Sequence, residues 1–190
     1  MKEEAQKILS FWFEKCPDME KWFTKSTEYD DHITKEFKHL LEEAEEGKCF
    51  GWLMTKESYL AHIVLLDQFS RQIYRGTKKA FQNDLGVLIF TKMGIDVYYN
   101  SLNDYEKMFV LLPYMHSELL IYQKEGYKRV LKELDKNEDS PFWKNVCMHT
   151  VGHMEVIEKF GRFPKRNKAL GRESTEEEKK YMEEHPNRPY

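Results

Sequence analysis

Residues 56–74 place apolar side chains at almost every angle around a helix. The apolar members are Tyr59, Leu60, Ile63, Val64, Leu65, Leu66, Phe69 and Ile73. A helix that is apolar all round has to be enclosed by other elements, so this segment predicts a central helix that closes at Gly76. The polar residues on this helix therefore need a structural or functional reason.

Apolar residues at helical spacing also precede the central segment. A first amphipathic helix is predicted to end before Cys16 and Pro17, with Ala5, Ile8, Leu9 and Trp12 as its apolar positions. For a second helix, Thr27 and Asp30 resemble a capping box and Gly47 marks the end. We therefore expect two helices before the central one.

Turn signals divide the following part of the chain. Asp84 is expected to cap a helix that contains Gly94, a weak helix former, and residues 104–111 predict a short helix. Since Pro113 suits a first helical turn, a further helix is predicted over residues 113–123, and another just beyond Gly126.

The C-terminal part has the clearest helix caps. Ser140 and Pro141 predict the start of a helix that ends before Gly161, and Thr175 with Glu178 predicts a capping box for a last helix. No segment of the sequence shows the sustained period-two alternation that is typical of strands. The chain is therefore predicted to be all-α.

Length and cysteine content indicate one intracellular globular domain over residues 1–190, with a flexible tail at residues 185–190. A chain of this length can bury roughly 70% of the surface that its unfolded form exposes. The three cysteines, Cys16, Cys49 and Cys147, are far apart and form no CxxC pair, so neither a disulfide framework nor a zinc site is indicated. A reducing cytoplasm fits this pattern.

Charge and hydropathy disfavour several classes of partner. The net charge of -3 argues against nucleic acid, since phosphate binding depends on Lys and Arg. The first residues, MKEEAQKILSFWF, carry charges where a secretory signal needs an apolar core, and no apolar run is long enough to cross a bilayer. We therefore expect a cytoplasmic protein with no nucleic-acid or membrane partner and no cofactor.

Residues 160–175, FGRFPKRNKALGREST, concentrate positive charge among turn residues. The cations are Arg162, Lys165, Arg166, Lys168 and Arg172, and all of them precede the first acid, Glu173. In an acidic protein this density indicates a site for one small anion, because guanidinium groups hold carboxylate or phosphate with two N–H donors. Asn167 adds an amide. The alternative is a loop held to the helices by salt bridges.

The central helix has a polar stripe of its own. Asp67, Arg71 and Arg75 recur every four residues, with Gln68 beside them. On a helix that is otherwise apolar, such a stripe faces either a cavity or a partner cluster. A structural salt bridge is the alternative interpretation.

Histidines supply the titratable candidates. His116 and Gln123 are seven residues apart and are predicted to share a helix face, whereas Glu118 points elsewhere. His149 and His153 are predicted to point inward, and their spacing could suit a metal if His116 or Asp67 supplied a third ligand. The alternative is a pair of core histidines bonded to backbone carbonyls. No metal is expected.

Several stretches together resemble the family known as domain of unknown function 924: ILSFWF, LLDQFSRQIYRGTKKAF, HSE and FGRFPKRNKALGREST. The resemblance covers about residues 8–178 and implies a tetratricopeptide-like array of antiparallel helix pairs, without implying a reaction. The motif positions are Asp67, Gln68, Arg71, Arg75, Asp84, His116, Glu118, Gln123, His153, Arg162, Arg166, Asn167 and Arg172. Lys165 and Ser70 depart from the family pattern, which commonly has His and Pro at these positions.

These observations lead to a functional hypothesis: a pocket that binds a small carboxylate- or phosphate-bearing molecule. His116 and His153 would titrate and Asp67 would orient an Arg or His. The binding residues would be Arg71, Arg75, Gln68, Gln123, Arg162, Arg166, Asn167 and Arg172. We expect residues from both sets to meet in one cavity. The rival hypotheses are a tetratricopeptide-like module that clamps an acidic peptide, and a purely structural polar cluster.

Overall fold

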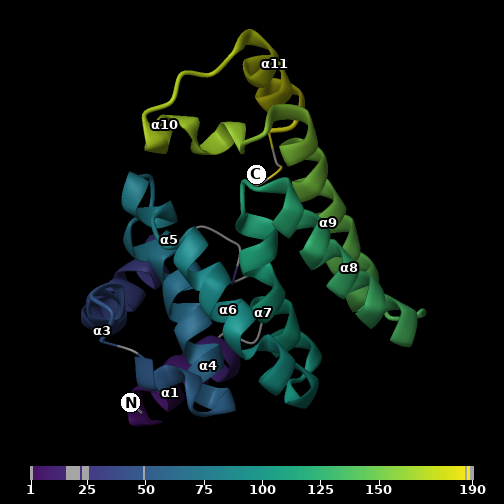
Figure 1. Ribbon diagram of the computed structural model, residues 1–190. Helices are drawn as coiled ribbons and strands as arrows, with labels where there is room; N and C mark the ends of the chain where they lie inside the picture. Colours follow the sequence, from purple (N-terminus) through teal and green to yellow (C-terminus); the bar gives the residue numbers. More distant parts are fainter. Residues whose placement is uncertain (1, 16–21, 23–25, 49, 187, 189–190) are drawn as a thin grey trace. The chain divides into compact units, whose positions relative to one another are not determined.

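The computed structural model describes residues 2–15, 22, 26–48, 50–186 and 188 (Figure 1). Over these residues every regular element is helical and no strand occurs, so the all-α prediction is confirmed. The chain divides into two compact units, residues 1–113 and residues 114–190, called here the N-terminal and C-terminal units. The expected single domain and the expected tetratricopeptide-like array stay predictions.

The N-terminal unit contains α1 (Lys2–Leu9), α3 (Thr27–Glu45), α4 (Lys56–Ile63), α5 (Ser70–Ile73), α6 (Asp84–Tyr98) and most of α7 (Asp104–His116). π-helical turns follow α1 at Ser10–Lys15 and join α4 to α5 at Val64–Phe69. Short 3-10 helices lie at Phe50–Leu53, Lys78–Phe81 and Tyr99–Ser101.

The predicted central helix is the continuous run of α4, the π-helical turn and α5. Helices α1, α3 and α6 pack against it, and all six residues of the π-helical turn are buried. Aromatic rings fill the space beside it: the Phe69 ring centroid lies 4.8 Å from that of Phe37 and 5.3 Å from that of Trp12. Gly76 ends the run with a φ of 76°, as the sequence predicts.

Gly94 lies inside α6 because Tyr59 packs directly against it. A Cβ atom on Gly94 would come within 2.5 Å of the Tyr59 ring. The Tyr59 hydroxyl donates a 2.8 Å hydrogen bond to the carbonyl of Thr91, which fixes the ring against α6. The glycine that lowers helix propensity therefore allows α4 and α6 to approach each other closely.

Two predicted helix caps are wrong. Helix α3 is capped by Ser26, whose hydroxyl accepts from the Tyr29 N–H, and not by Thr27. Asp84 is the first residue of α6 and does not cap it. Its carboxylate instead accepts a 3.0 Å hydrogen bond from Arg71, a long-range partner that local sequence does not reveal.

The predicted helix over residues 113–123 is also wrong. Pro113 lies inside α7, which continues to His116, and the next helix, α8 (Leu120–Lys136), begins after a short connection. Burial on α7 outweighs the helix-breaking tendency of proline, since the residues around Pro113 belong to the core. Helix α8 also runs through Gly126, where a Cβ atom would lie 2.6 Å from the Tyr114 Cβ.

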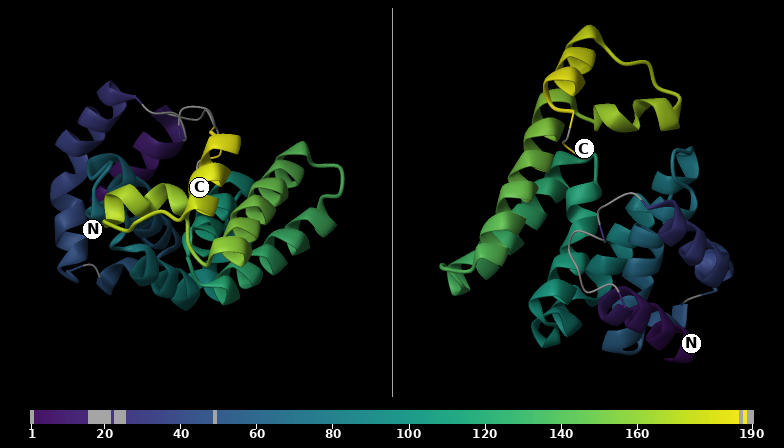
Figure 2. Two further views of the ribbon diagram at one scale, coloured as in Figure 1. Left: turned by 90° about the horizontal axis from the view of Figure 1, so that it is seen from above. Right: turned by 180° about the vertical axis from the view of Figure 1, so that it is seen from behind.

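The C-terminal unit is built on α8 and α9 (Pro141–Phe160), which lie side by side (Figures 1 and 2). The predicted caps are confirmed here. Ser140 accepts from the Trp143 N–H, Gly161 follows α9 with a φ of 68°, and Thr175 forms a capping box with Glu178 on α11 (Glu176–Glu184).

A small core joins α9, α11 and the loop between them. It consists of Val156, Ile157, Phe163 and Tyr181, with Leu120 and Phe160 packed against it. Between α9 and α11, residues 160–175 contain a 3-10 turn, Pro164–Arg166, and the short α10 (Asn167–Leu170). The described helices include none with the length and apolar character needed to span a membrane.

Part of the predicted flexible tail, residues 187 and 189–190, lies outside the described residues. Arg188 is described, and its guanidinium donates to the Tyr181 hydroxyl at 3.2 Å. Lys165 donates to the carbonyls of Pro186 and Arg188. The flexibility of residues 185–190 stays a prediction.

Candidate functional site

Arg162 holds the start of the basic loop, residues 160–175, against α11. Its guanidinium donates to both carboxylate oxygens of Glu178, at 2.6 and 2.8 Å, and to the carbonyl of Glu173 at 2.9 Å. Glu178 also accepts from the Thr175 N–H and from Asn167. The Arg162 hydrogen bonds lower the pKa of Glu178 to about 2, so this buried carboxylate is ionised at neutral pH.

Arg172 holds the other end of the loop through Glu118, which lies between α7 and α8. The two terminal nitrogens of Arg172 donate to the two carboxylate oxygens of Glu118, at 2.7 and 2.9 Å. The Arg172 Nε donates to Asn167, and the Phe163 N–H donates to Glu118. Burial alone would raise the pKa of Glu118, but these hydrogen bonds outweigh it and hold the pKa below its ordinary value.

Both arginines thus use their donors within the chain. This pairing corresponds to the alternative interpretation, a loop held to the helices by salt bridges. The carboxylate partners are Glu178 and Glu118. Their predicted roles in ligand binding stay predictions.

His116, His153 and Arg166 form a second group, in which His153 and Arg166 contact the Phe163 ring and His116 lies beside His153. The ring centroids of His116 and His153 are 6.1 Å apart, and the His153 ring meets the edge of Phe163 at 5.8 Å. The Arg166 guanidinium lies over the Phe163 ring, 4.4 Å from its centroid. Phe163 is fully buried, whereas the other three side chains are partly exposed, so the group borders on solvent.

His153 is held as a neutral imidazole. Its Nδ1 lies 2.8 Å from the carbonyl of His149, which can only accept, so Nδ1 carries the hydrogen and Nε2 is left as an acceptor. Burial of the ring, followed by the positive charge of His116 and of Arg166, lowers the pKa of His153 to about 3. An imidazole in this state can accept a hydrogen bond at neutral pH but carries no charge.

Two predictions about neighbouring side chains are wrong. Gln123 shares no helix face with His116, because the two residues lie on α8 and α7. The Gln123 amide is buried and donates to the carbonyls of Met115 and Ser117, at 2.5 and 2.7 Å, which caps the end of α7. His149 is exposed and does not point inward. Within the described ranges no group of three His, Cys, Asp or Glu residues could hold a metal ion.

In the N-terminal unit, the predicted polar stripe is held together by its own charges. Asp67 is fully buried in the π-helical turn, with the Gln68 amide at 2.5 Å and the Arg71 guanidinium at 3.5 Å. Arg71 also donates to Asp84 at 3.0 Å and to a backbone carbonyl. Turns of the π type occur frequently at functional sites, and the sequence gives no sign of this one.

Arg75 lies apart from that cluster. It donates to both carboxylate oxygens of Asp30 on α3, at 2.6 and 2.8 Å. The structure therefore brings together Asp67, Gln68 and Arg71 in one unit, and His116, His153 and Arg166 in the other. The convergence of both sets on one cavity stays a prediction.

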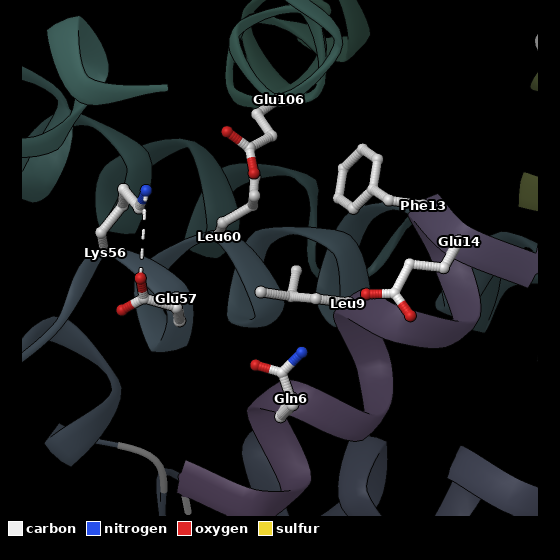
Figure 3. A pocket seen from close by; sticks show the side chains of 8 residues that line it. All are labelled: Gln6, Leu9, Phe13, Glu14, Lys56, Glu57, Leu60 and Glu106. Carbon is white, nitrogen blue, oxygen red and sulfur yellow. Dashed lines mark ion pairs between the residues drawn. The ribbon is translucent and has the colours of Figure 1, made fainter. Parts of the chain in front are cut away.

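A cavity of about 180 Å³ lies in the N-terminal unit, between α1, α4 and α7 (Figure 3). Its lining residues are Gln6, Leu9, Phe13, Glu14, Lys56, Glu57, Leu60 and Glu106. Carboxylates outnumber the one lysine, which lies 3.9 Å from Glu57. This lining would repel an anion, and it includes none of the predicted site residues. Sequence reasoning missed it because the lining comes from α1, the π-helical turn after it, α4 and α7, which only the fold brings together.

Comparison with known proteins places the chain in a family. The model of the family described as bacterial proteins of unknown function, DUF924, matches residues 8–186. A solved structure of a protein of unknown function from Agrobacterium tumefaciens, ATU0120, is similar with a TM-score of 0.82 and 32% sequence identity, over 95% of this chain and 97% of that one. No match was found among curated proteins. The family resemblance predicted from the four sequence stretches is thereby confirmed, and the chain belongs to the DUF924 family.

Proposed function

We propose that the C-terminal unit binds a small anionic molecule, with carboxylate or phosphate groups, at His116, His153 and Arg166. The observation that carries this proposal is the pairing of two imidazoles, 6.1 Å apart, next to the guanidinium of Arg166. The Arg166 guanidinium is positively charged, and either imidazole gains a positive charge when it is protonated. A group of this kind attracts a negatively charged ligand.

Electrostatics at His153 support an anion. After burial, His116 and Arg166 both lower the pKa of His153. A bound carboxylate or phosphate would oppose this effect, because a nearby negative charge favours the protonated imidazole.

The Phe163 ring supplies a rigid base for the site. It is fully buried, and its backbone is tied to Glu118 and Arg172. Stacking uses the face of the Arg166 guanidinium, whereas the N–H donors of a guanidinium lie in its plane. The salt-bridged loop thus serves to position Phe163 and, through it, Arg166.

The same geometry limits the acid–base chemistry that the site could perform. A histidine with a pKa of about 3 is a poor general acid at neutral pH, because almost none of it is protonated. A bound anion would raise that pKa toward the working range. Any proton transfer by His153 would therefore depend on the ligand being bound.

Isothermal titration with inorganic phosphate and with succinate at neutral pH tests the proposal, with chloride at equal ionic strength as the reference. We expect binding to the unmodified chain, and a loss of about ten- to a hundredfold in affinity for Arg166→Gln, since a charged hydrogen bond contributes about 1.5–3 kcal/mol. Arg129→Gln is the matched control, because the Arg129 guanidinium also lies over an aromatic ring, that of Tyr114, and the substitution removes the same charge.

Equal affinity in Arg166→Gln, Arg129→Gln and the unmodified chain would contradict the proposal, as would the absence of any heat above the chloride reference. A peptide with an acidic C-terminus, titrated alongside, tests the rival interaction module. Binding of the peptide without binding of phosphate or succinate would favour that module.

A further inference from the structure

Helix α6 carries four large apolar side chains on its outer face. Leu85, Ile89, Met93 and Val97 follow one another every four residues, and they are 54%, 50%, 59% and 71% exposed. The opposite face of α6, with Val87, Leu88, Thr91 and Ile95, is buried in the N-terminal unit. Single exposed apolar residues are ordinary on protein surfaces, but a contiguous row marks an interaction surface. We call this row the α6 ridge.

We propose that the α6 ridge is the interface between two copies of this chain. Side chains four residues apart form a ridge that is inclined to the helix axis. Two such ridges interdigitate when their helices cross at about -50°, which is the commonest packing between helices. A second copy supplies an identical ridge, and a two-fold axis brings the same surface of each copy into contact.

The charges beside the ridge favour a second copy over an unrelated partner. Lys92 and Asp96 are exposed, are one helical turn apart, and follow Ile89 and Met93 at a spacing of three residues. They therefore lie along one flank of the ridge. A two-fold axis that passes halfway between them would bring Lys92 of each copy opposite Asp96 of the other.

The same axis also suits the apolar side chains. It offsets the two ridges by half of their spacing, so that Met93 of the second copy would fall between Met93 and Val97 of the first. Val97 of the second copy would fall between Ile89 and Met93. The register that pairs the charges is thus the register that interdigitates the ridge.

The expected dimer is reversible. A contact confined to one helix of each copy is small compared with the interfaces of permanent dimers. The dimer population should therefore rise with protein concentration, and sedimentation velocity over a wide concentration range measures it. A chain that stays monomeric at every concentration would overturn the proposal.

Substitutions on the ridge test its position. Met93→Lys places like charges close to the two-fold axis and is expected to yield a monomer that remains folded by circular dichroism. Met148→Lys, on α9, is the matched control, because Met148 is 62% exposed and lies outside the ridge. Equal dimer content in the Met93→Lys variant, the Met148→Lys variant and the unmodified chain would exclude the ridge as the interface.

A charge exchange between two chains tests the pairing itself. Lys92→Asp and Asp96→Lys each create two like charges on the flank, so each variant alone should dimerise more weakly than the unmodified chain. Mixing the two variants brings opposite charges together across the axis and should restore the dimer. A pair formed only within one helix cannot produce this restoration, so a mixture as weak as its components would refute the proposed register.

Other occupants of the ridge would give different results. Another segment of the same chain would leave the unmodified protein monomeric while Met93→Lys lowered its melting temperature. A different protein partner would also leave the purified chain monomeric, with an unchanged melting temperature in Met93→Lys. Either result would overturn the proposal of a second copy.

Discussion

The two terminal nitrogens of Arg172 each donate a hydrogen bond to one carboxylate oxygen of Glu118, at 2.7 and 2.9 Å. The two residues are 54 positions apart in the chain, and their pairing fixes the basic loop to the connection between α7 and α8. Two-point contacts of this kind restrict geometry as well as adding energy. The arginines of the loop therefore have different surroundings. Arg162 and Arg172 hold the loop in place, whereas the charge of Arg166 lies near the histidine pair.

Removal of Arg172 should destabilise the fold. Arg172→Gln leaves a partly buried carboxylate without its main partner, which we expect to lower the free energy of unfolding by about 1–3 kcal/mol. Urea denaturation followed by circular dichroism measures the change. The double variant with Glu118→Gln should lose less than the sum of the two single variants, because each single change already breaks the pair. Additive losses would show that the two residues act independently.

Two glycines in α6 should respond in opposite directions to alanine. Gly94→Ala brings a Cβ atom within 2.5 Å of the Tyr59 ring, and we expect a loss of about 1–3 kcal/mol. Gly86→Ala is the control in the same helix, since a Cβ atom there meets nothing within 4 Å. Alanine at this second position should stabilise the protein by about 0.5–1 kcal/mol through helix propensity. Thermal or urea unfolding of both variants decides whether close packing or propensity governs each site.

His62 should make stability depend on pH. The residue is 6% exposed, and burial lowers its pKa to about 4. The unfolded chain, with an ordinary histidine pKa near 6.5, binds this proton more readily than the folded chain, so stability falls as the pH drops from about 6.5 to about 4. The pKa difference corresponds to about 3 kcal/mol. Urea denaturation of His62→Leu should show a smaller loss over this range, and an unchanged pH slope would contradict the assignment.

Local sequence patterns predicted those features of the fold that depend on neighbouring residues. The caps at Ser140 and Thr175 are of this kind, because each is made by a side chain and a backbone N–H three residues away. The family resemblance rests on short contiguous stretches of sequence, so it could also be predicted without the structure. The central helix followed from its all-round apolar character.

Features set by distant partners were not predictable in this way. Gly94 and Gly126 look like weak points in a helix until Tyr59 and Tyr114 are seen against them. Pro113 looks like a helix start from the neighbouring sequence, whereas the structure places it inside α7 among buried residues. For the site, the sequence revealed that residues 160–175 are cationic.

The pairing of those cations required the structure. Arg162 and Arg172 find their carboxylates in Glu178 and Glu118, respectively. An i, i+4 spacing placed His149 and His153 on one helix, but only the position of α9 shows that His149 is exposed while His153 meets Phe163.

Anion binding at the proposed site should be linked to protonation of His153. Its pKa is about 3 in the unliganded protein, owing to burial and to the charges of His116 and Arg166, and a bound anion favours the protonated form. Affinity should therefore rise as the pH falls from 8 to 5. Sulfate is the suitable probe, because it keeps its two charges over this range and its own titration does not interfere. Isothermal titration in buffers with different ionisation enthalpies would detect the accompanying proton uptake. In His153→Gln the uptake should shrink, whereas Arg129→Gln, which changes charge elsewhere on the same unit, should retain it. Equal proton uptake by His153→Gln and the unmodified chain would mean that another group titrates, and His153 would then lose its place in the site.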